Sequence, residues 1–153
     1  MKKGRRTAAA LSLLLATSAC QESLAPAPPV DTSARDFLAL ATRVEAPLED
    51  ALAEFDTASA RGDSPACLAA ARRAIEAART ARDEIEKSAV PRSLVAARRE
   101  ELTYLNHVVP GFQAFLAGGA GTAEIGKVRS ILARGRSHQS RGRAALREAE
   151  TGR

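Results

Sequence analysis

The sequence predicts an all-α protein, an up-down-up-down four-helix bundle. The chain is 45% hydrophobic but only 3% aromatic. Alanine, the strongest helix former, supplies much of the apolar content, whereas the residues that favour strands are scarce. Apolar residues recur at three- and four-residue steps in four segments, which are separated by breaks at 62–65, 88–91 and 118–121. The connections are short, so successive helices are expected to be antiparallel.

The first two helices are predicted on either side of Gly62. The predicted core stripe of the first comprises Phe37, Ala41, Val44, Leu48, Leu52 and Phe55. The second is expected to begin with Ser64 as its cap and Pro65 at the first helical position. Its predicted core stripe comprises Leu68, Ala71, Ile75, Ala78 and Ile85.

The third helix is predicted to open with Pro91 and the fourth near Thr122. The core stripe expected for the third comprises Val95, Leu102, Leu105, Val109, Phe112 and Leu116. The fourth begins with the apolar residues Ile125, Val128 and Leu132. Its pattern then weakens through Gly135, Gln139 and Gly142 before Leu146.

The charges favour a bundle in which the first and fourth helices are neighbours. Residues 32–60 contain six acids and two arginines, a net charge of −4, whereas residues 121–153 contain eight basic residues and three acids, a net charge of +5. Such complementary charges favour one arrangement over its alternatives.

Two prolines lie inside these apolar stripes, Pro47 in the first helix and Pro110 in the third. An interior proline removes a backbone hydrogen bond and kinks or splits a helix. The favoured interpretation is that each proline divides its segment into two shorter helices. The alternative is that paired kinks open a small ligand cavity near Pro47, Asn106 and Pro110.

The N-terminus has the pattern of a secretory signal peptide. Residues 1–6 contain four basic residues and no acid, and a leucine-rich run follows at 8–16. This run is shorter than the ~20 residues that span a bilayer. A charged start, a short apolar centre and then small residues are typical of an export signal, here residues 1–19.

The segment Ala16-Thr17-Ser18-Ala19-Cys20 resembles the lipobox of bacterial lipoproteins. The resemblance implies cleavage before Cys20 and attachment of diacylglycerol to its sulfur, so that the chain is anchored to a membrane. Thr17 stands where the family usually has leucine, and plain secretion after a cut at Ala19 is the alternative. Gln21 beside the cysteine implies outer-membrane sorting if the source is a diderm bacterium.

Residues 20–34 are predicted to form the lipidated N-terminus and a flexible tether, and residues 35–150 the bundle. Pro26, Pro28 and Pro29 favour an extended backbone in the tether. A dozen such residues reach on the order of 35 Å. A tether of this length would hold the bundle away from lipid headgroups.

Cysteine and histidine form no metal or catalytic motif in the sequence. Cys67 is predicted to be a small buried residue, with a reactive thiol as the alternative. His107 is expected on a partly exposed polar face and His138 in a solvated strip. Neither histidine has the spacing to a second ligand that metal motifs require. We therefore predict no catalytic residue, no metal site and no cofactor.

The basic tract at 134–143 is the one feature suited to a generic anionic partner. The favoured interpretation is a solvated helix end matched by the acidic first helix, and anionic lipid headgroups are the alternative. From Cys20 onward the chain has 19 basic and 18 acidic residues. This balance, and the lack of aromatic residues among the arginines, argue against nucleic acid.

We therefore expect an exported, lipid-anchored protein of the bacterial cell envelope. Its helical bundle is expected to bind a protein partner or the membrane surface and not to be an enzyme. The alternative is a small-ligand or metal-binding bundle of the periplasm or cell surface. The helical body also resembles small uncharacterised helical lipoproteins, a resemblance of style that implies no particular ligand.

Overall fold

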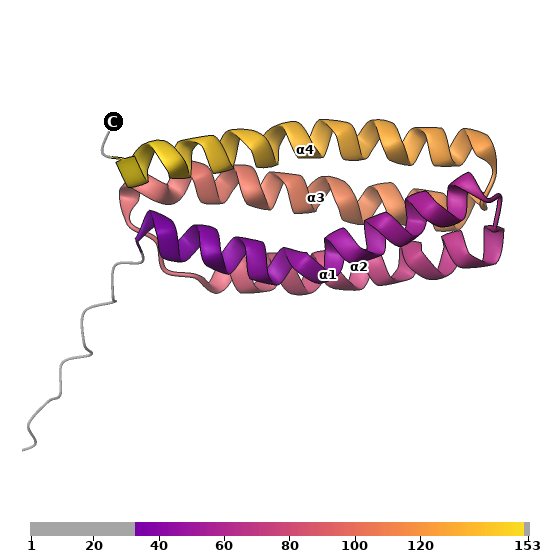
Figure 1. Ribbon diagram of the computed structural model, residues 1–153, viewed down its shortest axis with the longest axis horizontal. Coiled ribbons are helices and arrows are strands. Elements are labelled where there is room, and N and C mark those ends of the chain that lie inside the picture. The colour runs from indigo at the N-terminus through magenta and orange to yellow at the C-terminus, as the bar shows by residue number, and fades with distance from the viewer. Residues whose placement is uncertain (1–32, 152–153) are drawn as a thin grey trace, which may run out of the picture.

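The computed structural model of the chain describes residues 33–151, which form four long helices (Figure 1). These are α1 (Ala34–Ala60), α2 (Ser64–Lys87), α3 (Val95–Gly118) and α4 (Thr122–Thr151), and a short 3-10 turn, η1 (Arg92–Leu94), leads into α3. Successive helices run in opposite directions, so the predicted up-down-up-down bundle is confirmed. The predicted signal peptide, residues 1–19, and residues 20–32 of the predicted tether lie outside the described residues.

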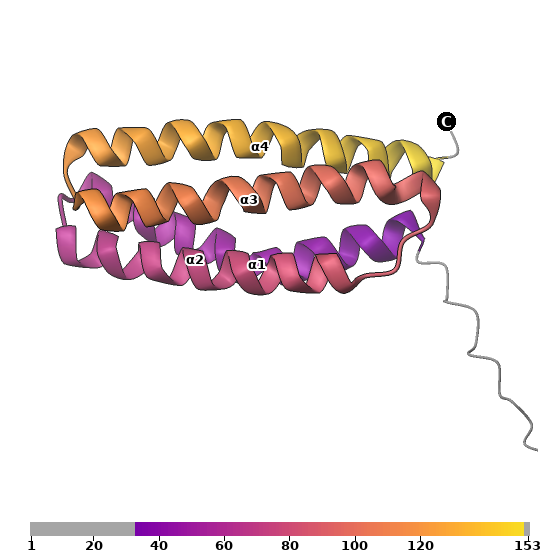
Figure 2. The ribbon, with the colours of Figure 1, turned by 180° about the vertical axis from the view of Figure 1, so that it is seen from behind.

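The bundle consists of two helical hairpins. α1 packs along α2 and α3 packs along α4, and both of these interfaces are more extensive than the one between α1 and α4 (Figures 1 and 2). The start of α1 lies at the same end of the bundle as the end of α4 and the connection between α2 and α3. No helix within residues 33–151 is long and apolar enough to cross a membrane.

The helix ends follow the predicted breaks, with two differences. α3 begins at Val95 after η1 and not at Pro91, whose backbone is extended, and the cap of α2 is shifted by one residue. Ser33 caps α1, because its Oγ accepts a hydrogen bond of 3.1 Å from the backbone N–H of Asp36. The cap of α2 is Asp63, whose carboxylate accepts a 3.0 Å bond from Ala66. The prediction of Ser64 as this cap was wrong by one residue, because the acidic side chain one position earlier accepts the hydrogen bond of a free N–H group, that of Ala66.

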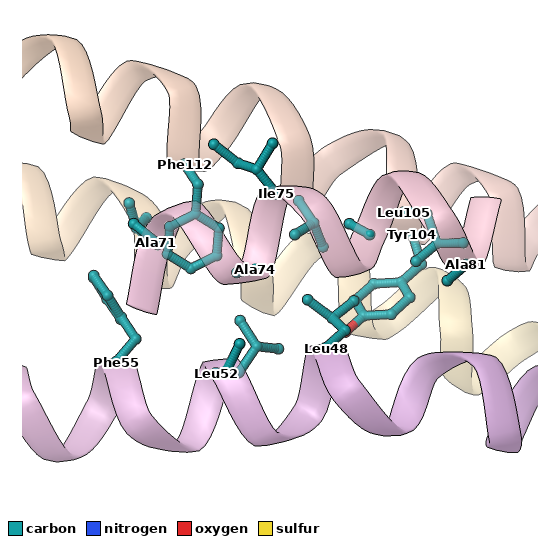
Figure 3. Packing of buried hydrophobic residues seen from close by; sticks show 14 of the residues in the cluster. Leu48, Leu52, Phe55, Ala71, Ala74, Ile75, Ala81, Tyr104, Leu105 and Phe112 are labelled. Carbon is teal, nitrogen blue, oxygen red and sulfur yellow. The ribbon is translucent and has the colours of Figure 1, made fainter. Parts of the chain in front are cut away.

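The core lies along the middle of the bundle, and the predicted stripes of α1 and α2 face it. In Figure 3, Leu48, Leu52 and Phe55 of α1 point toward the side chains of α2 and α3. The ring of Phe55 meets those of Phe112 and Phe115 edge to face, at 5.0 and 5.1 Å between centres. Between these large residues α2 contributes mainly alanines, which are buried and let its neighbours approach closely. They are Ala70, Ala71, Ala74, Ala78 and Ala81.

The predicted stripe of α3 was rotated relative to the observed one. Val95, which was expected in the core, is 53% exposed, while Tyr104 and Val108 are fully buried. α3 has apolar residues on more than one face, and it packs against both α2 and α4. The face buried between these neighbours comprises Ala97, Glu101, Tyr104, Leu105, Val108, Gly111, Phe112 and Phe115.

Neither interior proline divides its helix, so the favoured prediction of shorter helices was wrong. α1 continues through Pro47 and α3 continues through Pro110. α1 instead changes direction about halfway along its length (Figure 1), and Pro47 lies near the middle of its 27 residues. Packing on both sides of each proline offsets the lost backbone hydrogen bond.

Candidate functional site

The most unusual feature of the core is a pair of buried carboxylates. Glu45 on α1 is 1% exposed and Glu101 on α3 is 0% exposed. One oxygen of Glu45 and both oxygens of Glu101 have no hydrogen-bond partner among the described residues. Burying a charge without partners costs free energy. The groups that face the two carboxylates therefore determine how the fold accommodates them.

Two side chains of α4 face the carboxylates. Gln139 donates a hydrogen bond of 2.6 Å to Glu45, and Arg143 donates one of the same length to the same oxygen. The Nε of Arg143 also lies 3.5 Å from Glu101 Oε1. The cluster therefore joins α1, α3 and α4 around one guanidinium, with two carboxylates for a single positive charge.

A proton on Glu101 balances this charge. The pKa of Glu101 is raised to about 8, first because burial removes water from the carboxyl group and then because of the neighbouring carboxylate of Glu45. The guanidinium of Arg143 acts in the opposite direction on this pKa. Glu101 thus keeps a proton at neutral pH, which removes one negative charge from the surroundings of the guanidinium.

Charged pairs extend from this cluster along the interface between α1 and α4. Three arginines of α4 are spaced seven residues apart and pair with three acids of α1. The pairs are Arg143 with Glu45 at 2.6 Å, Arg136 with Glu49 at 3.3 Å and Arg129 with Asp56 at 3.6 Å. The predicted charge complementarity between the first and fourth helices is confirmed. Only the first of these pairs includes a buried partner.

The interface between α3 and α4 is built differently, around buried glycines. A side chain at Gly142 would place its Cβ 3.1 Å from the carbonyl oxygen of Ala97. One at Gly135 would lie 3.1 Å from the ring of Tyr104. The weakened apolar pattern near the end of α4 is therefore a contact face, on which missing side chains let the two backbones approach.

Tyr104 links the two interfaces. Its ring packs against Gly135, and its hydroxyl donates a 3.1 Å hydrogen bond to Glu49. Burial, followed by the nearby carboxylate of Glu49, raises the pKa of Tyr104. The phenol is therefore a neutral donor that helps to hold α3 against α1.

Cys67 is buried, as predicted. The side chain is 1% exposed. Burial, and then the negative charge of Asp63, raise the pKa of its thiol. A thiol of this kind is a poor nucleophile, so the alternative of a reactive cysteine is disfavoured. Cys20, the predicted lipidation site, lies outside the described residues.

The two prolines line different surface hollows, so the predicted shared cavity is not present. Pro47 lines an open hollow of about 360 Å³ between α1 and α2. Asn106 and Pro110 line another, of about 450 Å³, between α3 and α4. The remaining walls of this second hollow are Thr103, His107, Gly111, Ile131 and Arg134.

Most arginines of the basic tract are engaged by acids within the bundle. Arg136 and Arg143 pair with α1, and Arg141 lies 3.3 Å from Glu100 of α3. Arg134 forms no ion pair with another residue in 33–151. This pattern supports the interpretation of the tract as a helix face matched by the acidic first helix.

The two histidines lie together on the outer side of the interface between α3 and α4. Both are partly buried, and their ring centres are 5.3 Å apart. His138 was expected in a solvated strip, but it contacts both His107 and Glu100. The hydrogen bond from His138 is the main reason that the pKa of Glu100 is lowered, and Arg141 adds to the effect. No group of three or more metal-ligating side chains occurs among the described residues.

The sequence analysis missed the buried carboxylates, although a signal was present. Glu45 falls four residues after Ala41 and three before Leu48, on the predicted core stripe of its helix.

A comparison of the chain with models of known families, with curated proteins and with solved structures finds no match.

Proposed function

We propose that this chain is an exported protein, lipid-anchored at Cys20 in the bacterial cell envelope, whose helical bundle acts by binding a protein partner. The observation that carries this proposal is the N-terminal pattern of a cationic start, a leucine-rich run and the lipobox-like segment ending in Cys20.

The start of the bundle is consistent with such an anchor. Only twelve residues separate Cys20 from Ser33, the cap of α1. Beyond this cap the chain is continuously helical for 27 residues. A short segment rich in proline therefore separates the proposed lipid from a folded body.

The ionisable core supports binding in preference to catalysis. Glu101 and Tyr104 have strongly raised pKa values, which often mark catalytic groups. Both residues are 0% exposed, and both face neighbouring helices. A substrate would have to separate the helices to reach them, so their role in this fold is structural.

The surface favours a protein partner over the lipid headgroups. Acids of α1 and α3 already neutralise Arg129, Arg136, Arg141 and Arg143, which weakens attraction of α4 to an anionic membrane. Val95 is the only large hydrophobic side chain exposed within residues 33–151. The partner surface is therefore expected to be polar and charged.

The anchor is tested by the intact mass of the protein purified from bacterial membranes. A chain that begins at Cys20 and has added acyl mass is the expected result. The variant Cys20→Ser should lack that mass and leave the membrane fraction, whereas Cys67→Ser should behave as the wild type. An unmodified chain that begins at Cys20 would replace the proposal with plain secretion, and an uncleaved chain would remove the case for export.

A small-ligand or metal-binding bundle is the second candidate. The observation that favours it is the open hollow between α3 and α4, where His107, Asn106 and Arg134 surround an apolar floor. This function would not require the lipid anchor.

A further inference from the structure

α3 contains an uncharged stretch that no other described helix matches in length. Between Glu101 and its end at Gly118, α3 has no aspartate, glutamate, lysine or arginine. The longest such run in α1, α2 or α4 is 64–71, less than half as long. We name the outer side of residues 102–118 the α3 face. Its exposed residues, which are all small or uncharged, are Asn106, Pro110, Gln113, Ala114, Ala117 and Gly118.

The α3 face lies on one side of the bundle, where α3 runs between α4 and α2 (Figure 2). Leu102, Val109 and Leu116 follow one another at seven-residue steps and are partly buried. They lie on the side of α3 toward α2, because Arg98, one turn before Leu102, donates a hydrogen bond to the carbonyl oxygen of Ser88 at the end of α2. The α3 face therefore has an apolar edge toward α2 and a centre of small and polar residues.

Two arginines of α2 border the α3 face. Arg72 and Arg79 are exposed, and neither forms an ion pair with another residue in 33–151. Their neighbours Arg73 and Thr80 line a hollow against α1. One residue corresponds to a rotation of about 100° around a helix, which turns Arg72 and Arg79 away from α1 and toward α3. α2 and α3 are antiparallel and joined at 88–94, so Arg79 stands beside the first turns of the α3 face and Arg72 beside its middle.

The opposite edge of the α3 face has a third arginine. Arg134 of α4 is exposed and lines the open hollow of about 450 Å³ between α3 and α4. It also has no ion-pair partner within residues 33–151. The acids nearby are already paired, Glu100 with Arg141 and Glu124 with Lys127. The α3 face is thus uncharged at its centre and positive at two edges.

We propose that the α3 face is the docking surface for a protein partner that presents uncharged side chains to its centre and carboxylates to Arg72, Arg79 and Arg134. The centres of protein interfaces are depleted of charged residues, whereas arginine is enriched in interfaces. A partner can cover the α3 face without burying an unpaired charge. The three guanidiniums then pair with the partner's carboxylates. This inference rests on the proposed function of binding a protein partner, and it identifies the surface and the chemistry of that partner.

The α3 face suits a protein better than a lipid surface. A helix that binds in a membrane interface presents large apolar side chains on its exposed side. The exposed residues of the α3 face are small or polar, and Leu102 and Leu116 are partly buried. The hollow beside Arg134 has room for a side chain of a partner. These features favour a shaped, polar contact over insertion into lipid.

The test is site-specific photo-crosslinking of the full-length chain in the source bacterium. Benzoylphenylalanine replaces either Gln113, at the centre of the α3 face, or Ala46, on the exposed side of α1 across the bundle. A cross-link to one protein is expected from position 113 and not from position 46. Mass spectrometry should place this cross-link in a segment of the partner that contains acids beside uncharged residues.

Charge reversal tests the edges of the α3 face. The triple variant Arg72→Glu, Arg79→Glu and Arg134→Glu should abolish the cross-link and weaken binding of the purified partner by about tenfold or more. A matched variant reverses three exposed arginines elsewhere that also lack an ion pair in 33–151. They are Arg35, Arg43 and Arg147. This variant has the same net charge and should keep its affinity within about twofold. Circular dichroism checks that both variants are folded.

Each other outcome overturns the proposal in a distinguishable way. A cross-link from position 46 and not from 113 would keep the proposed protein partner but place it on another face. Cross-links from 113 only to lipid, or only to a second copy of the chain, would assign the α3 face to the membrane or to self-association. Equal losses of affinity in the two triple variants would remove the role of the edge arginines. No cross-link from either position would contradict the protein partner itself, whereas the lipid anchor is tested separately by mass.

Discussion

The two interfaces of α4 bring helices together by opposite means. Toward α3, α4 presents Gly135 and Gly142, so that backbone and ring atoms of α3 occupy the space a side chain would take. Toward α1 it presents long arginines, which reach acids across a wider gap. A hollow of about 250 Å³ remains between α1 and α4, lined by residues that include Leu52, Asp56 and Arg129.

This difference shows that one helix can combine close packing with charge pairing when the two lie on separate faces. The glycine face brings backbone and ring atoms of α3 into close contact with α4. The arginine face gives less contact area, and its three charged pairs are all formed in the observed alignment of α1 against α4. Glu101 lies where the two faces meet, since it packs near Gly142 and pairs with Arg143.

The largest effect is expected from removing the one guanidinium that reaches the buried carboxylates. Arg143→Met should lower the free energy of unfolding by about 3–5 kcal/mol, because it leaves Glu45 buried without its charged partner. Arg129→Met is the matched control, since Arg129 and Asp56 are both more than half exposed, and it should cost less than about 1 kcal/mol. Urea denaturation followed by circular dichroism measures both. Equal losses in the two variants would contradict the distinction between the buried and exposed pairs.

Filling the glycine face is expected to have the next largest effect. Gly142→Leu should lower the free energy of unfolding by about 2–3 kcal/mol, because the new side chain would clash with the backbone of Ala97. Gly126→Leu is the control on the same helix, where a Cβ would meet no other atom within 4 Å. That change should stabilise the protein by up to about 1 kcal/mol through helix propensity. Thermal melts of both variants decide the matter, and a tolerated Gly142→Leu would mean that α3 and α4 are free to separate.

The charge imbalance of the core predicts a dependence of stability on pH. The folded state holds a proton on Glu101 up to about pH 8, whereas the unfolded chain releases it near pH 4.5. Stability should therefore fall as the pH rises between these values, because the folded state binds more protons. Glu101→Gln has no such proton and should be more stable than the wild type by roughly 2–4 kcal/mol at pH 8. Denaturation curves at pH 5, 6.5 and 8 test this, and parallel pH profiles for the two proteins would refute it.

The smallest effect concerns the link between the two interfaces. Tyr104→Phe keeps the ring against Gly135 and removes the hydrogen bond to Glu49. The free energy of unfolding should fall by about 1 kcal/mol. Glu49→Gln, which keeps an acceptor for the tyrosine hydroxyl, should lower the free energy of unfolding by less than Tyr104→Phe does. A loss larger than that of Arg143→Met would mean that the phenol, and not the guanidinium, is the main connection between α1 and its neighbours.

Most of the fold could be predicted from local pattern, and the errors have physical causes. The breaks were visible as Gly62, Pro65 and Gly119 because these residues act through their own backbone. The face of α3 was misjudged because that helix has two apolar sides, and its neighbours decide which one is covered. The prolines were misjudged because packing around Pro47 and Pro110 outweighs a single lost hydrogen bond.

The candidate sites could be predicted less well, since each is made of residues from different helices. Glu101 looks like a surface acid in a local window, and the place of Glu45 on the core stripe of α1 does not show what surrounds it. Only the meeting of α1, α3 and α4 buries them around one arginine. The two histidines were assigned separately, His107 to a partly exposed polar face and His138 to a solvated strip, because nothing in their local sequence indicates that Gly135 lets them approach.

By itself the sequence determined the helix count, the antiparallel order, the opposite charges of the first and last helices and the lipobox-like pattern on which the proposed anchor depends. These follow from short-range preferences or from totals of charge, which can be obtained from the sequence without knowledge of the fold. The tertiary structure alone decided which face of α3 is buried, which acids are buried away from solvent and that His107 contacts His138. Those outcomes depend on contacts between residues far apart in the chain, where packing and desolvation outweigh the preference of any single segment.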